Sequence, residues 1–171
     1  VFAGEQLSVG RRVAVKVLRS NFAIDDTTFE RFFREARTIS ELRHPNIVRL
    51  VDFGQDEDLE AVYLVMEFVE GTSLSDLLGR GRLRPAVAIE IVAQICAGLS
   101  EPHQRGIVHR DLKPDNIRLF GLSDGTLQVK VLDFGIARTL EEEDDRLTDT
   151  GVVCGTPAYM APEQSRGLSV D

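Results

Sequence analysis

Two spacings of apolar residues recur along this chain, and they predict its first strands and its first helix. Valine alternates with other residues at Val13, Val15 and Val17, which is typical of a β-strand, so residues 1–18 are predicted to form two short strands around a turn. A second set of apolar residues recurs every three or four positions and predicts a helix over residues 25–42. The members of this set are Phe29, Phe32, Phe33 and Ala36.

Further strands are predicted between proline and turn-forming residues. Pro45 ends the first helix, because the residue before a proline favours extended geometry. Residues 47–53 and 61–68 then have strand character, and residues 117–120 and 127–132 are predicted to be the two strands of a hairpin.

Two more helices are predicted in the middle of the chain. Residues 73–79 form the shorter one, and Pro85 begins the longer one, as proline is favoured in the first helical turn. We expect Cys96 to be a small core residue on the apolar face of the longer helix. The predicted apolar face consists of Ala88, Val92, Ile95, Cys96 and Leu99.

Composition and charge restrict the class of protein. The chain has 171 residues, of which 43% are hydrophobic and 28% charged, as is ordinary for a globular domain. A net charge of −8 argues against nucleic acid or an anionic membrane surface as the main partner. We therefore expect no nucleic-acid partner and no membrane contact within this segment. Two cysteines form no disulfide framework, so a reducing cytoplasm is the expected compartment.

Reactive side chains are concentrated in residues 106–116, which read GIVHRDLKPDN. Pro114 removes a backbone donor, which favours a shaped loop over a helix. Asp111, Lys113 and Asn116 place a carboxylate, an ammonium and an amide in this loop. The complete pattern H-R-D-L-K-x-x-N resembles the catalytic loop of protein kinases.

Five other segments resemble kinase motifs and occur in the same order as in that family. The VAVK segment ending at Lys16 resembles the strand whose lysine binds the ATP phosphates, and the helix with Glu35 resembles the helix that pairs with it. MEFVEG, from Met66, resembles the hinge, and CGTPAYMAPE resembles the end of an activation segment. Asp133 begins DFG. Alone, VAVK or DFG would indicate an ordinary strand or loop entry.

The chain is thus similar to eukaryotic-like (Hanks-type) serine/threonine protein kinases, and its phrases most resemble the bacterial members. The resemblance implies an α+β, two-lobed protein kinase fold that is truncated, with an antiparallel sheet and helix C in the N-lobe. Residues 1–66 would be an N-lobe without its first strand and glycines, residues 67–71 the hinge, and residues 72–171 a C-lobe without its later helices. We expect this polypeptide alone to have little stability or activity, and the function to belong to its parent protein.

The resemblance also implies cofactors and roles for individual residues. ATP and Mg²⁺ are the expected cofactors, with Mn²⁺ as an alternative metal. Asp111, Lys113 and Asn116 would be catalytic, and Asn116 and Asp133 would hold the metal. Lys16 and Glu35 would form an ion pair on the nucleotide. The implied nucleotide-binding residues are Val1, Ala14, Lys16, Glu35, Met66, Glu67, Val69 and Asp133.

Control by phosphorylation is implied as well. A phosphate on either of two threonines in the activation loop would pair with a cluster of arginines and order the loop, whereas a third threonine would support the catalytic groups. The two switch threonines are Thr148 and Thr150, the supporting one is Thr156, and the arginines are Arg110, Arg138 and Arg31.

These features predict transfer of the ATP γ-phosphate to serine or threonine hydroxyls of proteins, with autophosphorylation of the activation loop. The expected partners are protein substrates and ATP, together with a homodimer for autophosphorylation in trans. The chain would be cytoplasmic, either freely or as the cytoplasmic domain of a membrane-anchored parent.

Two other classes of function remain open. A pseudokinase would keep the fold as a binding or scaffolding module. It is favoured by Arg118, which stands where the family has an apolar residue beneath the adenine ring. The arginine could lie against the base or weaken ATP binding. A small-molecule kinase is disfavoured by Lys113 and the GTPAY–APE segment.

Overall fold

Residues 1–19, 26–56, 58–59, 61–121, 125–134 and 157–166 are described by the structure, which is a computed structural model. They divide into two units. The N-terminal unit contains Val1–Glu41 and Arg49–Phe68, and the C-terminal unit contains Leu42–Val48, Val69–Phe134 and the described residues from 157 onward. In this described part of the chain, no helix is both long enough and apolar enough to span a membrane.

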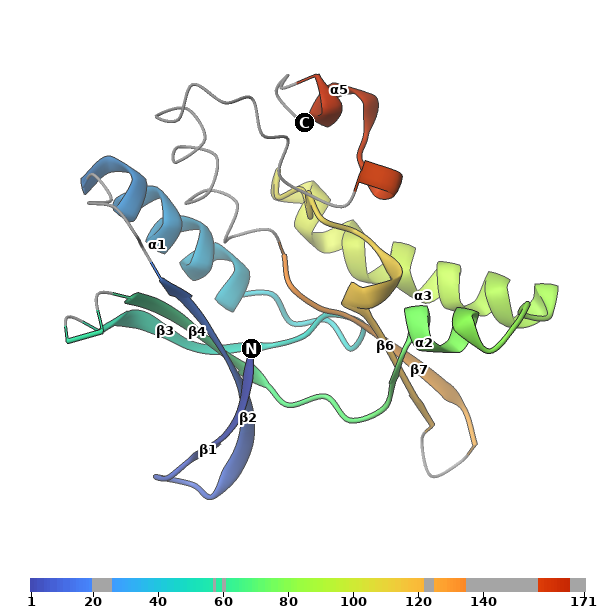
Figure 1. The fold of residues 1–171 in the computed structure, drawn as a ribbon, viewed down its shortest axis with the longest axis horizontal. Coiled ribbons are helices and arrows are strands. Elements are labelled where there is room, and N and C mark those ends of the chain that lie inside the picture. Colours follow the sequence, from blue (N-terminus) through green and yellow to red (C-terminus); the bar gives the residue numbers. More distant parts are fainter. Residues whose placement is uncertain (20–25, 57, 60, 122–124, 135–156, 167–171) are drawn as a thin grey trace. The chain divides into compact units, whose positions relative to one another are not determined.

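The N-terminal unit is a four-stranded antiparallel sheet with one helix. Its strands run in the order β1 (Phe2–Gln6), β2 (Arg11–Arg19), β4 (Ala61–Glu67) and β3 (Leu50–Asp56), and the helix is α1 (Asp26–Ser40; Figure 1). Phe32 and Ala36 on α1 are fully buried, and the rings of Phe33 and Phe53 lie 5.6 Å apart, which joins α1 to β3. The predicted helix and its apolar face are confirmed.

The C-terminal unit combines helices with a three-stranded sheet in the order β5 (Thr72–Ser73), β6 (Ile117–Gly121) and β7 (Leu127–Val131). Its helices are α2 (Leu74–Gly79), α3 (Pro85–Gln104) and α5 (Pro162–Ser165), with 3-10 turns η1 (Pro114–Asn116) and η2 (Pro157–Tyr159) (Figure 1). Val129 and Val131 are fully buried. The predicted hairpin of β6 and β7 is confirmed.

The third strand begins later than the sequence predicts. Residues 47–53 were expected to be a strand, but β3 starts at Leu50. The reason is that Val48 donates its amide to the Val131 carbonyl (2.9 Å) and Val131 donates to the Asn46 carbonyl (2.8 Å). Ile47 therefore belongs to the C-terminal unit, where it is a parallel bridge partner of Val131, and is not part of β3.

Two amide side chains complete the hydrogen bonding along the outer edge of β7. Gln94 on α3 accepts the Val129 amide (2.9 Å) and donates to the Leu127 carbonyl (2.8 Å). Asn46 donates to the Val129 carbonyl (2.7 Å) and to the Gln94 side chain (2.8 Å). These amides take the place of a fourth strand, which satisfies backbone groups that would be costly to bury unpaired.

The buried face of α3 matches the predicted one only in part, since Leu99 is buried as predicted but two other members are not. Val92 is 56% exposed and Cys96 is exposed, so the prediction that Cys96 is a core residue is wrong. The helix buries a partly different face because Gln94 must point at β7. The buried residues of α3 are Ile91, Gly98, Leu99 and Pro102.

We predict that Gln94→Leu destabilises the protein by about 2–4 kcal/mol, since the Val129 amide and Leu127 carbonyl would lose their partner. Gln104→Leu is the matched control, because Gln104 is an exposed glutamine on the same helix that bonds only to Ser100 (3.3 Å). Urea unfolding of both variants measures the difference, and equal losses of stability would contradict this role of Gln94.

Candidate active site

A left-handed glycine separates α3 from the polar loop that follows. Gly106 has φ +71° and donates its amide to the His103 carbonyl (3.0 Å), and the next residue, Ile107, donates to the Pro102 carbonyl (2.9 Å). This αL ending is the usual way to satisfy the last carbonyls of a helix. Residues 108–113 therefore leave α3 as an irregular segment before η1 begins at Pro114.

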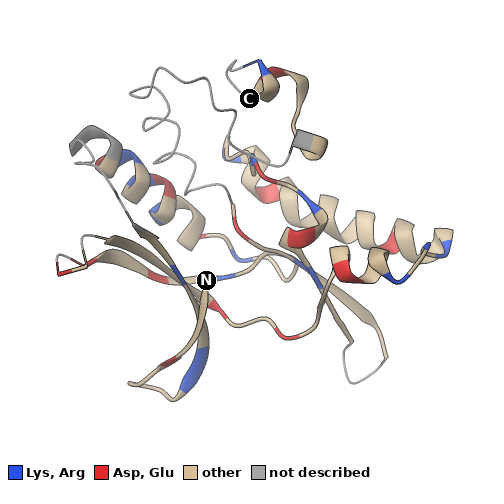
Figure 2. Cartoon of the chain, viewed as in Figure 1, with Lys and Arg blue, Asp and Glu red and all other residues tan. Residues whose placement is uncertain are grey.

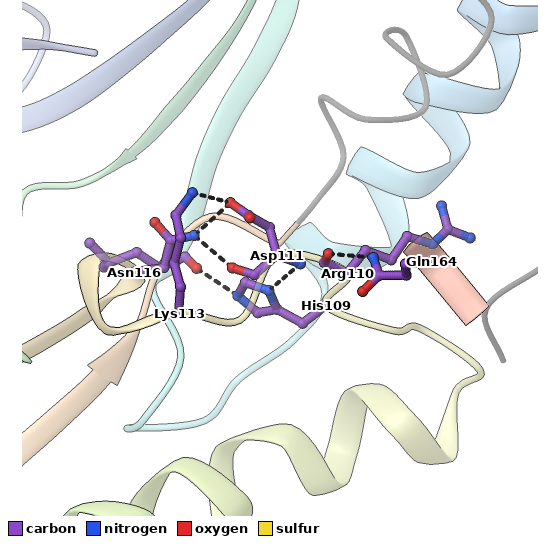
Figure 3. A network of polar contacts seen from close by, with 7 residues as sticks. His109, Arg110, Asp111, Lys113, Asn116 and Gln164 are labelled. Atoms are coloured by element: carbon purple, nitrogen blue, oxygen red, sulfur yellow. Dashed lines mark hydrogen bonds and ion pairs between the residues drawn. The ribbon is translucent and has the colours of Figure 1, made fainter. Parts of the chain in front are cut away.

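His109 ties this loop to the residues that follow β7. Its ring is 2% exposed, its Nε2 lies 2.8 Å from the Leu132 carbonyl, and its Nδ1 accepts the Asp111 amide (3.3 Å; Figure 3). These partners require a neutral ring with the proton on Nε2. Burial lowers the pKa of His109 below 6.5, while the Leu132 carbonyl opposes the shift. The ring also packs 4.8 Å from Phe134.

Two residues of this region have left-handed backbone conformations. Arg110 has φ 60° and Asp133 has φ 48°, and each non-glycine residue of this kind costs about 1–3 kcal/mol. The Asp111 amide bonds to the His109 carbonyl at 2.8 Å, which makes Arg110 the centre of a γ-turn. Strain held in this way is typical of functional sites.

Asp111 is held by two neighbours that belong to the same predicted catalytic set. Its Oδ2 lies 2.9 Å from the Lys113 ammonium and accepts a 3.0 Å hydrogen bond from the Asn116 amide, which also donates to the Asp111 carbonyl (2.8 Å; Figure 3). The side chains of Asp111 and Lys113 are only partly buried. A carboxylate in this position can orient and accept a proton from an incoming hydroxyl.

The side chains of Asn116 and Asp133 offer oxygen ligands of the kind Mg²⁺ prefers. Both hydrogen bonds of the Asn116 side chain use its Nδ2, which leaves Oδ1 to face a cation. Asp133 follows the bonded carbonyl of Leu132, and the Leu132 amide donates to the Asn116 carbonyl (2.8 Å). Two protein oxygens fit a metal that keeps several water or phosphate ligands.

Gln164 joins the same network from α5, although no motif in the sequence predicts it as a site residue. Its Nε2 donates to the Arg110 carbonyl (2.8 Å; Figure 3). Its Oε1 accepts the Ala161 amide (3.1 Å). The signal in the sequence is a glutamine three positions after the residue that precedes Pro162, which is capping-box spacing. That spacing predicts the helix cap but not the bond to Arg110.

Arg118 lies on β6 opposite Ser73, and its side chain reaches Gly71, just before β5. Its guanidinium donates to the Gly71 carbonyl (3.2 Å). The Ser73 side chain caps α2. The pKa of the Asp76 carboxyl is lowered, mainly by its hydrogen bond with the Ser73 side chain and to a smaller extent by the charge of Arg118. Gly71 has φ +117°, and a Cβ there would meet the Leu119 carbonyl at 2.3 Å, so only glycine fits.

The other predicted nucleotide residues lie on separate elements. In the N-terminal unit, Val1 precedes β1, Ala14 and Met66 are register partners on β2 and β4, Lys16 follows on β2 and Glu35 lies on α1. Glu67 ends β4, where its carboxylate accepts the Arg49 amide (2.9 Å). Val69 belongs to the C-terminal unit. The Lys16–Glu35 ion pair stays a prediction.

The remaining predicted regulatory residues, Arg138, Thr148, Thr150 and Thr156, lie outside the described residues.

Charged residues of both signs occur in each unit (Figure 2). Helix α1 carries acidic and basic side chains along its length, and the segment between α2 and α3 carries the exposed arginines Arg80, Arg82 and Arg84.

Comparison with known proteins establishes the family. The sequence model of the protein kinase domain family matches residues 1–169. The chain therefore belongs to the protein kinase domain family, and its structure has elements of the two-lobed α+β fold of that family, with an antiparallel N-lobe sheet and C-lobe helices.

The similar relatives include bacterial serine/threonine kinases. The chain is 46% identical to the serine/threonine-protein kinase Pkn2 of Myxococcus xanthus, over 100% of this chain and 20% of that protein. It is 44% identical to PknB of Mycobacterium tuberculosis, over 100% of this chain and 27% of that protein. The chain thus spans roughly a fifth to a third of the length of the curated relatives it matches.

Solved structures of similar fold include a kinase domain. The kinase domain of PknI from Mycobacterium tuberculosis matches with a TM-score of 0.70 and 29% identity, over 94% of this chain and 57% of that one. Rad53 residues 1–466, solved in complex with AMP-PNP, match with a TM-score of 0.70 and 35% identity, over 92% of this chain and 36% of that one.

We predict that stability falls as the pH drops below the ordinary histidine range, and that His109 carries part of the loss. The unfolded chain binds a proton near pH 6.5, whereas folded His109, with its lowered pKa, does not. Stability is therefore lost as the pH falls from 6.5 towards the pKa of folded His109. Well above pH 6.5 the ring is neutral in both states, and His109 has no effect on the pH dependence of stability.

The matched variant is His109→Gln, whose amide can still donate to the Leu132 carbonyl but does not titrate. Urea unfolding at about pH 7.5 and about pH 5.5 should show a smaller loss for the variant than for the wild type. His44 and His103 are present in both proteins and cancel. Equal losses would show that His109 does not titrate as described.

Proposed function

We propose that the protein containing this chain is a serine/threonine protein kinase, which transfers the γ-phosphate of ATP to hydroxyl groups of protein substrates. The observation that carries the proposal is the Asp111 carboxylate, held by Lys113 and Asn116 in a strained loop on a chain of the kinase family. Support also comes from relatives named as serine/threonine kinases along the whole length of this chain.

Each group of this loop has a role in the proposed transfer. Asp111 orients the substrate hydroxyl and accepts its proton as the oxygen attacks the γ-phosphorus. The new O–P bond forms while the bond between the γ-phosphorus and the bridging oxygen breaks, and ADP leaves with that oxygen. Lys113, with its ammonium 2.9 Å from Asp111, lies where it can also balance charge on the transferred group.

ATP and Mg²⁺ are the proposed cofactors, with Mn²⁺ as an alternative metal. The complex of Rad53 with AMP-PNP, an ATP analogue, supports the nucleotide. Asn116 and Asp133 would hold the metal, which supplies positive charge that neutralises the phosphate oxygens. Lys16, paired with Glu35, would hold the phosphates. Val1, Ala14 and Met66 would surround the base, and the backbone from Glu67 to Val69 would meet its edge.

Control by autophosphorylation is the proposed means of regulation. A phosphate on Thr148 or Thr150 would add about −1.5 to −2 charge and could pair with Arg110 and Arg138. Two copies of the chain would meet for this reaction in trans. The cytoplasm, where ATP is abundant, is the proposed compartment, either for a free protein or for the inner part of a membrane-anchored parent.

Asp111→Asn is the first test, made in the full parent protein. We expect the rate of transfer to a protein substrate to fall by about 10²–10⁴-fold, since the proton acceptor is lost. Mass spectrometry should find phosphate on Thr148 or Thr150 in the wild type only. Asp115→Asn is the control, because Asp115 is an exposed carboxylate of the same loop.

Three results would contradict the assignment. Equal transfer by wild type and Asp111→Asn would remove Asp111 from the chemistry. No transfer by either protein would favour a pseudokinase, and transfer only to small molecules would favour a small-molecule kinase.

Arg118→Met tests the effect of having an arginine where the family has an apolar residue beneath the adenine base. Because the Arg118 guanidinium is held by the Gly71 carbonyl, we expect its apolar stem alone to lie beneath the base, as a methionine would. The ATP dissociation constant of Arg118→Met should then stay within about threefold of the wild-type value by calorimetry. A gain of tenfold or more would show that the arginine obstructs ATP, as the pseudokinase hypothesis requires.

A further inference from the structure

The peptide group between Arg110 and Asp111 is held at both ends. Its N–H belongs to Asp111 and donates to the His109 carbonyl (2.8 Å). Its carbonyl belongs to Arg110 and accepts from Gln164 Nε2 (2.8 Å; Figure 3). Rotation of this peptide group would break both hydrogen bonds and would change φ of Asp111, one of the torsions that set the direction of its carboxylate.

The backbone at this place needs such support. Arg110 has φ 60°, a conformation that residues with a Cβ rarely adopt, and it lies at the centre of a γ-turn. A strained turn persists only when its surroundings determine it. The His109 bond comes from within the turn itself, whereas the Gln164 bond comes from a residue 54 positions further along the chain.

The chemistry of glutamine fits both of its partners. Its oxygen accepts the amide of Ala161, the N-cap residue of α5, and its nitrogen donates to the Arg110 carbonyl. Only one orientation of the side-chain amide satisfies a donor and an acceptor at once. A glutamate could keep the bond to Ala161 but would set a carboxylate against a carbonyl oxygen.

We propose that Gln164 is a positioning residue for the catalytic aspartate, which it places by clamping the Arg110–Asp111 peptide group from α5. The proposal rests on the proposed kinase function. It means that the placement of α5, at the end of the segment that carries Thr148 and Thr150, is transmitted to the backbone of Asp111 through a single side chain.

Gln164→Glu in the full parent protein is the direct test. It removes the donor to Arg110 while keeping the acceptor for Ala161, so α5 keeps its cap. We expect kcat for protein phosphorylation to fall by about 10–100-fold, as a misplaced catalytic group would cause, with the KM for ATP unchanged. Gln164→Met, which removes both bonds, should lower kcat at least as much.

A second readout does not depend on activity. Hydrogen exchange at the Asp111 amide should become faster in Gln164→Glu, because the peptide group is free to rotate, while the unfolding temperature stays near that of the wild type. Ser165→Ala is the control, since the Ser165 hydroxyl bonds only within α5, to the Pro162 carbonyl (2.8 Å). It should change neither kcat nor this exchange.

The outcomes separate this inference from the proposed function. Unchanged kcat together with unchanged exchange in Gln164→Glu would overturn the inference in an active kinase. A raised KM for the protein substrate at constant kcat would also overturn it, by placing Gln164 in substrate binding. If the wild type transfers no phosphate, the proposed function fails, and the exchange experiment still decides whether Gln164 clamps the loop.

Discussion

The site depends on one buried imidazole that has to remain uncharged. His109 reaches the Leu132 carbonyl with Nε2 and the Asp111 amide with Nδ1, and the two bonds together require the neutral ring. The left-handed residues Arg110 and Asp133 lie beside these bonded groups. The same ring therefore fixes the backbone on both sides of the site, where the proposed proton acceptor and metal ligand are presented.

The imidazole in turn relies on the placement of β7, because its Leu132 partner directly follows that strand. Strand β7 is paired with β6 on one edge and is bonded on the other by Gln94, Asn46 and the backbone of residues 46–48. A polar face of α3 thus sets the position of the strand. Helix α3 thus positions β7, the residue after β7 positions the His109 ring, and that ring positions the backbone of Asp111.

The sequence predicted those elements whose burial follows a simple period. Helix α1 and the β6–β7 hairpin were found because Phe32 and Ala36, or Val129 and Val131, mark one buried face. The face of α3 is predicted only in part, because Gln94 and Gly98 also pack against the sheet or its neighbours and neither has an apolar side chain. A prediction based on apolar side chains alone places Val92 and Cys96 on the buried face of the helix, but both are exposed.

The site likewise contains residues that the sequence predicts and residues that it does not. The residues from His109 to Asn116 were found because their types and spacing form a family pattern, whereas Gln164 has no pattern beyond a helix cap. Its bond to Arg110 depends on how two distant segments approach each other, and spacing along the chain carries no information about that. The start of β3 was missed for a similar reason, since Ile47 pairs with β7.

The side-chain amides on β7 also bear on how this sheet meets other chains. An open strand edge with buried valines is a template for adding further strands, and it is a common starting point for aggregation. Gln94 and Asn46 occupy the hydrogen-bonding positions of Leu127 and Val129 that an incoming strand would need. These two side-chain amides thereby block the addition of a further strand to β7, so the sheet ends at three strands along this edge.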